Sequence, residues 1–220
     1  MPRAALFDVD GTLVDTNHLH VVTWWEALRQ AGRHVPMADI HRAIGLGSED
    51  LLAHLLGDDR DSDRDPAISA AHKTLYATYF DRLRAFEGAA DLLRALAAQQ
   101  WRVVLATSAG GAELAAMRRA IGADDALMAE ARADEVDAGK PAPDPVEEAL
   151  RRAGVGAGDA VFVGDSVWDM EAGTKAGVRA VGVLSGGVPR TALEAAGADA
   201  VYTSVEELLA ELDASPFGDV

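Results

Sequence analysis

The fold is decided by residues 4–12, Ala4-Ala5-Leu6-Phe7-Asp8-Val9-Asp10-Gly11-Thr12. An apolar run that is this short and ends in acidic residues and glycine is typical of a strand buried on both faces of a parallel sheet. Three later runs have the same character: Arg102 to Thr107, Ala160 to Val163 and Val178 to Val183. Helical patterns lie between and after them: Ala89 to Gln99, Ala112 to Ile121, Pro145 to Ala153, Trp168 to Ala176 and Ser204 to Leu212. This alternation predicts an α/β fold, a Rossmann-like doubly wound parallel sheet whose ligands lie at the carboxyl ends of the strands.

Residues 16–85 break the alternation because they offer helical patterns alone. These patterns cover Leu19 to Ala31, Glu49 to Leu56 and Ile68 to Leu83. We interpret the segment as an inserted α-helical cap domain over the crevice, with residues 1–15 and 86–220 forming the catalytic core. The Asp-rich stretch Gly57 to Pro66 lacks the spacing of a calcium loop and is predicted to be a solvated turn.

Composition excludes several classes of function. The formal net charge of −16 argues against a nucleic-acid partner or an anionic membrane, since both attract basic surfaces. The absence of cysteine excludes disulfides, thiolate metal sites and a cysteine nucleophile. With no apolar run of about 20 residues and no signal-peptide pattern, we expect a cytoplasmic protein. Any phosphorylated metabolite that binds to it must be drawn in by a local positive site. The sequence leaves the oligomeric state open, with a monomer as the default.

Asp8 and Asp10 form the first candidate site. Two carboxylates that follow a strand, with Gly11 permitting a tight turn, can face one cavity. Crowded like charges need a cation, so the pair predicts a hard divalent metal. The alternative is a structural turn, because Asp-Gly after a strand is a common hairpin signal.

Gly164-Asp165-Ser166-Val167-Trp168-Asp169 follows another apolar run. Asp165 is a candidate metal ligand, and Asp169 a ligand through water or a residue that orients its neighbours. The alternative is a helix N-terminus that carries acidic residues because the helix dipole favours them.

Two further segments offer phosphate-binding groups. Lys140 begins a proline-rich loop, and a rigid loop that presents one of only three lysines suits a fixed charge for phosphate. Thr107 and Ser108 end a strand before Gly110-Gly111, where hydroxyl and backbone N–H donors can form a phosphate nest. The alternatives are a surface lysine and, for Thr107, a helix cap.

These residues, taken in order, resemble the four signature motifs of the haloacid dehalogenase-like hydrolase superfamily, in its helical-cap subfamily. The likeness covers nearly the whole chain and is greatest to phosphoglycolate phosphatase-like and beta-phosphoglucomutase-like members. It implies that Asp8 is the nucleophile and Asp10 the acid and base. It implies a Mg²⁺ cofactor held by Asp8, the Asp10 backbone carbonyl and Asp165, with Asp169 in support. The phosphoryl group would be held by Gly11, Thr107, Ser108 and Lys140.

Positions at which this chain differs from the families it resembles reduce the number of candidate activities. Haloacid dehalogenases proper lack an acid at the position of Asp10, so dehalogenation is disfavoured. Beta-phosphoglucomutases carry an arginine in the cap loop, where this chain reads Gly45-Leu46-Gly47-Ser48-Glu49, and a glutamate in place of Gly164. We therefore predict hydrolysis of a small phosphate monoester, a phosphosugar or a phosphorylated carboxylic acid. The alternatives are a phosphomutase and a non-catalytic phosphate-binding module.

Five cap residues are candidate substrate contacts: Thr16, His20, Gly47, Ser48 and Lys73. His20 shares a helical face with Asn17 and Trp24, and this face is predicted to look into the crevice. The competing interpretations are helix packing for His20, an N-cap for Ser48 and a solvated helix position for Lys73. A related class of hydrolases uses a cap lysine to form a Schiff base, and Lys73 is the only lysine in the predicted cap.

Overall fold

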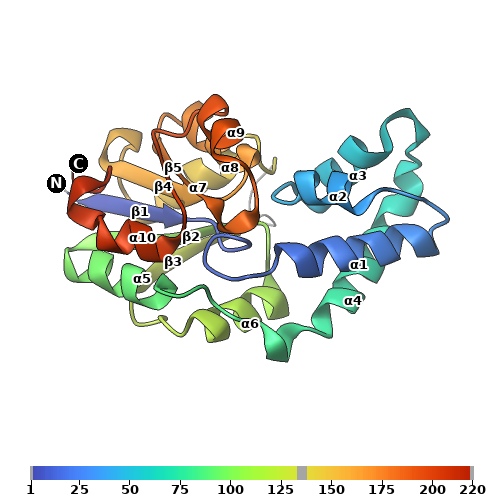
Figure 1. Ribbon diagram of the computed structural model, residues 1–220, viewed down its shortest axis with the longest axis horizontal. Helices are drawn as coiled ribbons and strands as arrows, with labels where there is room; N and C mark the ends of the chain where they lie inside the picture. The colour runs from blue at the N-terminus through green and yellow to red at the C-terminus, as the bar shows by residue number, and fades with distance from the viewer. Residues whose placement is uncertain (1, 133–137, 219–220) are drawn as a thin grey trace.

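The computed structural model describes residues 2–132 and 138–218, and its centre is a six-stranded parallel sheet (Figure 1). The strands are β1 (Arg3–Phe7), β2 (Trp101–Thr107), β3 (Leu127–Arg132), β4 (Ala160–Gly164), β5 (Arg179–Val183) and β6 (Ala200–Tyr202). Their order across the sheet is β3-β2-β1-β4-β5-β6, so the chain winds outward from β1 in both directions. The predicted doubly wound fold is confirmed.

Helices cover both faces of the sheet. One layer holds α5 (Ala89–Ala98), α6 (Gly111–Ile121) and α10 (Val205–Ala210), and the other holds α7 (Asp144–Ala153), α8 (Val167–Lys175) and α9 (Arg190–Ala195). Side chains alternate along each strand, so Ala5 and Phe7 pack with the first layer while Ala4 and Leu6 pack with the second. Burial on both faces explains why the strands have continuous apolar runs.

The structure adds three core elements to those predicted. The edge strand β3 reads Leu-Met-Ala-Glu-Ala-Arg, because an edge strand need not be apolar on both faces. The other edge strand, β6, has three residues, and α9 has six, so neither is long enough to give a periodic pattern.

Four helices form a second unit at the right of Figure 1. They are α1 (Asn17–Gln30), α2 (Met37–Ala43), α3 (Ser48–Leu56) and α4 (Asp65–Ala77). Their buried faces make a separate apolar cluster that includes Trp24, Ile40 and Leu51, against which Trp168 of the core also packs. The helix predicted over Ile68 to Leu83 is too long: α4 ends at Ala77, and a separate short 3-10 turn follows. The helix α2 was not predicted.

The chain enters and leaves the helical unit at one place. An isolated bridge pairs Val14 with Ala85. Beside it, the Asp15 N–H donates to the Arg84 carbonyl and the Phe86 N–H to the Leu13 carbonyl, both at 2.9 Å. Two chain segments that are hydrogen-bonded side by side therefore join the helical unit to the sheet.

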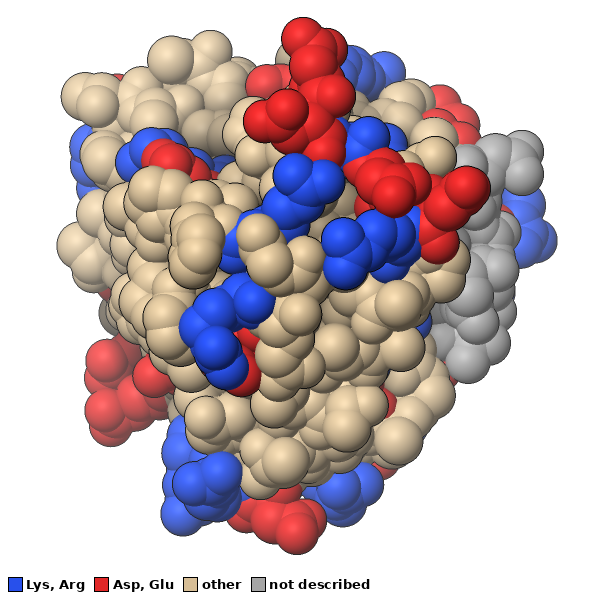
Figure 2. All heavy atoms as spheres, turned by 90° about the vertical axis from the view of Figure 1, so that its right-hand side faces the viewer, with Lys and Arg blue, Asp and Glu red and all other residues tan. Residues whose placement is uncertain are grey.

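The surface of the helical unit carries charges of both signs. Figure 2 shows this end of the molecule, where Lys and Arg side chains lie among Asp and Glu side chains. The stretch predicted as a solvated turn contains two short 3-10 helices, Gly57–Asp59 and Ser62–Arg64, and is largely exposed. Across residues 2–132 and 138–218, no helix has both the length and the apolar character required to cross a membrane.

Candidate active site

The candidate site lies at the centre of the sheet, where β1 and β4 are neighbours. Asp8 follows β1 and Asp165 follows β4, so both acids lie at the carboxyl edge. The connections leaving β1 and β4 run to opposite sides of the sheet, which opens a crevice at this point.

Three buried carboxylates meet in this crevice. One oxygen from each of Asp8, Asp165 and Asp169 lies within 4.8 Å of the others, and none of the three residues is more than 5% exposed. Burial, followed by repulsion from Asp169, raises the pKa of Asp165 to about 7. Burial also raises the pKa of Asp8, and Lys140 only partly opposes it. Withdrawal from water and mutual repulsion both disfavour the charged forms.

Lys140 supplies the positive charge in this cluster. Its ammonium group forms ion pairs with Asp8 and, at 2.7 Å, with Asp169 Oδ1. Burial alone would lower the pKa of Lys140, but the two carboxylates raise it above its ordinary value. Three carboxylates and one ammonium leave a net charge of −2 when all are ionised. An all-oxygen donor set with this charge fits a hard divalent cation such as Mg²⁺.

The Asp10 side chain turns away from the cluster and toward the helical unit. Its Oδ1 accepts hydrogen bonds from Thr16 Oγ1 at 2.6 Å and from His20 Nε2 at 3.0 Å. Although burial opposes ionisation of Asp10, the contacts with His20 and Thr16 lower its pKa. Burial also opposes the charged form of His20, but Asp10 raises the pKa of this imidazole. The backbone carbonyl of Asp10 remains the group that the resemblance implies for metal binding.

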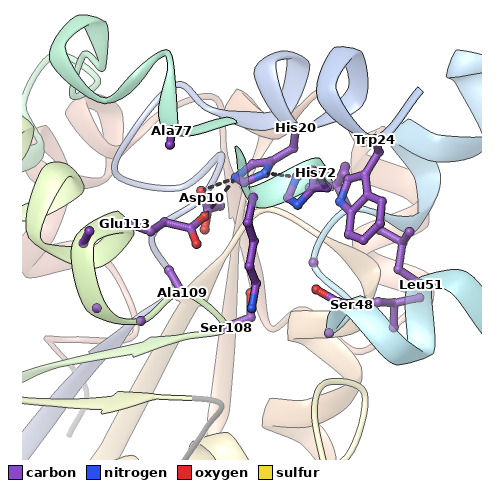
Figure 3. Close-up of a pocket in the computed structure, with 18 of the residues that line it drawn as sticks. Asp10, His20, Trp24, Ser48, Leu51, His72, Ala77, Ser108, Ala109 and Glu113 are labelled. Atoms are coloured by element: carbon purple, nitrogen blue, oxygen red, sulfur yellow. Dashed lines mark hydrogen bonds and ion pairs between the residues drawn. The ribbon is translucent and has the colours of Figure 1, made fainter. Parts of the chain in front are cut away.

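His20 links Asp10 to a second imidazole. His20 Nδ1 lies 3.2 Å from His72 Nε2, and burial followed by repulsion from His20 lowers the pKa of His72 to about 2. His72 is therefore neutral and can accept the Nδ1 proton of His20, while His20 donates its Nε2 proton to Asp10. Figure 3 shows this row, with His20 between Asp10 and His72.

A cavity of about 630 Å³ extends from Asp8 and Asp10 into the helical unit. In Figure 3, Glu113 lies on the same side as Asp10, and Trp24, Leu51 and Ser48 lie across from it. Burial, followed by repulsion from Asp10, raises the pKa of Glu113 to about 7. The cavity thus has one acidic wall and one largely apolar wall.

Six of the predicted residues outside the acid cluster line this cavity: Asp10, His20, Gly47, Ser48, Lys73 and Ser108. Ser48 is not the N-cap of α3, because that position belongs to Gly47 and Ser48 begins the helix. Lys73 lies on α4 with an exposed side chain, as the alternative of a solvated helix position predicted.

Gly11 and Thr107 are engaged within the core loops. The Gly11 N–H donates to the Val14 carbonyl at 2.9 Å, so it serves the turn. Thr107 Oγ1 accepts from the Ala109 N–H at 3.0 Å and is no helix cap, since the N-cap of α6 is Gly110.

Asp169 is both a helix-capping residue, as the alternative interpretation predicted, and a member of the acid cluster. Its Oδ2 accepts from the Ser166 N–H and hydroxyl, and Ser166 caps the Asp169 N–H in return, which is a capping box for α8. Its Oδ1 meets Lys140 within the acid cluster. A capping residue therefore fixes the geometry of the charged centre.

The sequence analysis did not identify His72 as a site residue, and it missed the contacts of Glu113 and Asn17. Glu113 reads as an ordinary acidic residue in the first turn of α6. Asn17 was grouped with the crevice-facing residues His20 and Trp24, but its amide turns to Asp165. The one sequence signal for Asn17 and Glu113 is that each lies just after a motif, residues 8–16 for Asn17 and residues 107–111 for Glu113.

The doubly wound sheet, the acidic centre at its switch point and the helical insertion together define a class of α/β enzymes. The chain belongs to the haloacid dehalogenase-like hydrolases, whose family model matches residues 2–177. It is 31% identical to a phosphoglycolate phosphatase of Rhodospirillum rubrum, over 94% of this chain and 90% of the relative.

Solved structures agree with this assignment. A hydrolase from Pseudomonas syringae has a TM-score of 0.92 and 32% identity, with 96% of this chain and 98% of that chain covered. A beta-phosphoglucomutase from Clostridium difficile has a TM-score of 0.86 over 100% of this chain and 98% of its own, and at 18% identity it shows the fold alone. The predicted family and enzyme class are confirmed.

Proposed function

We propose that this hydrolase is a Mg²⁺-dependent phosphatase that cleaves a small phosphate monoester through an aspartyl-phosphate intermediate on Asp8. The observation that carries the proposal is the pairing of Asp8 with Lys140 inside a buried acidic cluster, at the cavity that Asp8 and Asp10 both line. An ionised carboxylate beside a fixed cation suits attack on a phosphoryl group, whose oxygens would repel an unshielded acid.

In the first half of the reaction, an Asp8 oxygen forms a bond to phosphorus while the bond between phosphorus and the leaving oxygen breaks. Asp10 gives a proton to the leaving oxygen, which departs as an alcohol. Lys140 balances part of the charge on the transferring group. Because His20 lowers the pKa of Asp10, a proton must reach Asp10 before the leaving group departs.

In the second half, Asp10 takes a proton from water, and the resulting hydroxide attacks phosphorus and releases Asp8. The lowered pKa of Asp10 provides the ionised base that this step needs. His20 and Thr16 both bond to Oδ1, so they fix the carboxylate while Oδ2 remains available for proton transfer.

Asp8, Asp165 and the Asp10 backbone carbonyl would hold the Mg²⁺ ion, with Asp169 in support. When bound, the ion stabilises the negative charge on the phosphoryl oxygens. It would also offset the burial that raises the pKa of Asp8, so that the nucleophile stays ionised.

Residues 16–85 would act as a cap that selects the substrate. The cavity suits a small leaving group that is held by Ser48, Gly47 and Lys73 and excluded from bulk water. The names of the relatives include phosphoglycolate phosphatase, and phosphoglycolate belongs to the phosphorylated carboxylic acids, one of the two substrate classes that we propose.

Hydrolysis has more support than phosphoryl transfer to a second hydroxyl. A mutase must hold a second phosphate, and Lys73 is the single lysine or arginine that the cap contributes to the cavity lining among the described residues. A methyl group at Gly164 would lie 2.5 Å from Asp169 Cγ, so Asp169 fills the space that a glutamate would need.

The test is phosphate release from a panel of phosphosugars and phosphorylated acids, in Mg²⁺ or in chelator, by wild type and Asp8→Asn. Turnover that requires Mg²⁺ and disappears in Asp8→Asn is expected. Turnover by Asp8→Asn would refute the nucleophile assignment, and activity that appears only with added hexose bisphosphate would favour a mutase.

A further inference from the structure

Asp165 is held by neutral donors on both oxygens. Thr12 Oγ1 donates to Oδ1 at 2.9 Å, and Asn17 Nδ2 donates to Oδ2 at 2.8 Å. Thr12 belongs to the nucleophile loop, whereas Asn17 is the first residue of α1 and therefore part of the helical unit. The orientation of a core carboxylate thus depends on a side chain from the cap.

Asn17 is locked in this position. It is 5% exposed, and its Nδ2 also donates to the Gly186 carbonyl at 3.3 Å. A methyl group at Gly11 would lie 2.7 Å from Asn17 Cγ, and one at Gly186 would lie 2.5 Å from Asp165 Cγ. Two glycines therefore make the space in which the amide and the carboxylate meet.

We propose that Asn17 is a positioning residue of the metal site, which aims Asp165 at the ion and makes metal affinity depend on the seating of α1. An amide fixes the carboxylate without neutralising it, so the charge of Asp165 stays available to a cation. A lysine or arginine at position 17 would pair with the Asp165 carboxylate and so compete with the metal ion for its charge. Outer partners of this kind set the geometry and affinity of metal ligands.

Gly186 connects this contact to the rest of the cap. Its carbonyl accepts from Asn17 and also from His41 Nε2, at 2.9 Å, and His41 belongs to α2. Of these two cap side chains, Asn17 alone bonds to Asp165. His41→Ala is therefore a matched control: it removes a contact between the helical unit and Gly186 but leaves both hydrogen-bond donors of Asp165 in place.

The test is calorimetric titration with Mg²⁺ alone, without substrate, on wild type, Asn17→Leu and His41→Ala. Leucine keeps the side-chain volume and removes the donor. We expect Asn17→Leu to weaken Mg²⁺ binding about 10- to 100-fold and His41→Ala to stay within about threefold of wild type. The increase in Tm produced by Mg²⁺ should shrink in parallel for Asn17→Leu. If Asn17→Leu does not fold, Asn17→Ala carries the same expectation.

Wild-type affinity in the Asn17 variant would overturn the inference. So would an equal loss in His41→Ala, because the effect would then come from cap docking in general. If wild type binds no Mg²⁺, the metal site itself is refuted and this inference with it, whereas a failed substrate panel leaves the titration just as decisive.

Discussion

Replacing Gly186 with alanine is expected to displace Asp165 and to remove most of the activity while the fold is retained. The backbone at Gly186 is outside the left-handed region, so alanine adds no backbone strain there. The added methyl group would instead lie 2.5 Å from Asp165 Cγ and closer still to Oδ2. The carboxylate has to move, because its own contacts are side-chain hydrogen bonds whereas Gly186 is fixed in the chain.

The size of the effect follows from that distance. Carbon atoms that touch without strain lie about 3.5 Å apart, so the carboxylate must retreat by about 1 Å. A shift of about 1 Å in a reacting constellation costs about 100-fold in rate. Asp165 would also lose its alignment with Thr12 and Asn17, and each hydrogen bond to a charged group is worth about 1.5–3 kcal/mol.

The assay is kcat/KM for a phosphate monoester at saturating Mg²⁺, together with the free energy of unfolding from urea denaturation. Gly182→Ala is the matched control: its methyl group would meet Leu193 Cδ1 at 2.9 Å, and the atoms nearest to it belong to Leu193 and Val201 rather than to an acid. We expect it to lose about 1–3 kcal/mol of stability and little activity. If Gly186→Ala keeps more than about one third of wild-type kcat/KM, the reasoning about Asp165 is wrong.

Three further predictions concern the cavity. His20→Ala should lower kcat/KM about 10- to 100-fold at a temperature where the variant is fully folded. His18 is exposed, so His18→Ala should leave kcat/KM unchanged. An unchanged kcat/KM in His20→Ala would show that His20 does not take part in the reaction. Glu113 has its pKa raised from 4.5 to about 7, so wild type loses stability as the pH rises through this range. Glu113→Gln should therefore exceed wild type by about 1–3 kcal/mol in urea denaturation at pH 8 but not at pH 4.5, unlike the exposed Glu147→Gln. Lys73→Met should raise KM about two- to fivefold for a phosphorylated carboxylic acid only, and equal effects on a neutral phosphosugar would refute a charge contact.

The central strands and the acids that follow them could be predicted because the information is local. A strand buried on both faces needs a continuous apolar run, and the residues after it must supply the chemistry. Edge strands escape this rule, which is why β3, with Glu130 inside it, gave no signal. The end of α4 at Ala77 also had no local marker, since Thr78 and Tyr79 continue the polar and apolar pattern.

Contacts between the cap and the core could not be predicted. Asn17 has a helical periodicity that places it with His20, yet the first lies on Asp165 and the second on Asp10. When α1 packs against the core, two residues near its start therefore contact two different core loops. Periodicity describes one element at a time, whereas this division depends on where α1 meets the sheet.

The pairing of residues 13–15 with 84–86 makes the helical insertion a replaceable part. Because the chain leaves and returns through adjacent, hydrogen-bonded segments, the sheet is unaffected by how many residues lie between them. Recombination or gradual lengthening beyond the first turn of α1 can exchange the walls of the cavity while Asn17, the carboxylates and Lys140 keep their geometry. One chemical centre can in this way be inherited unchanged by enzymes of many specificities.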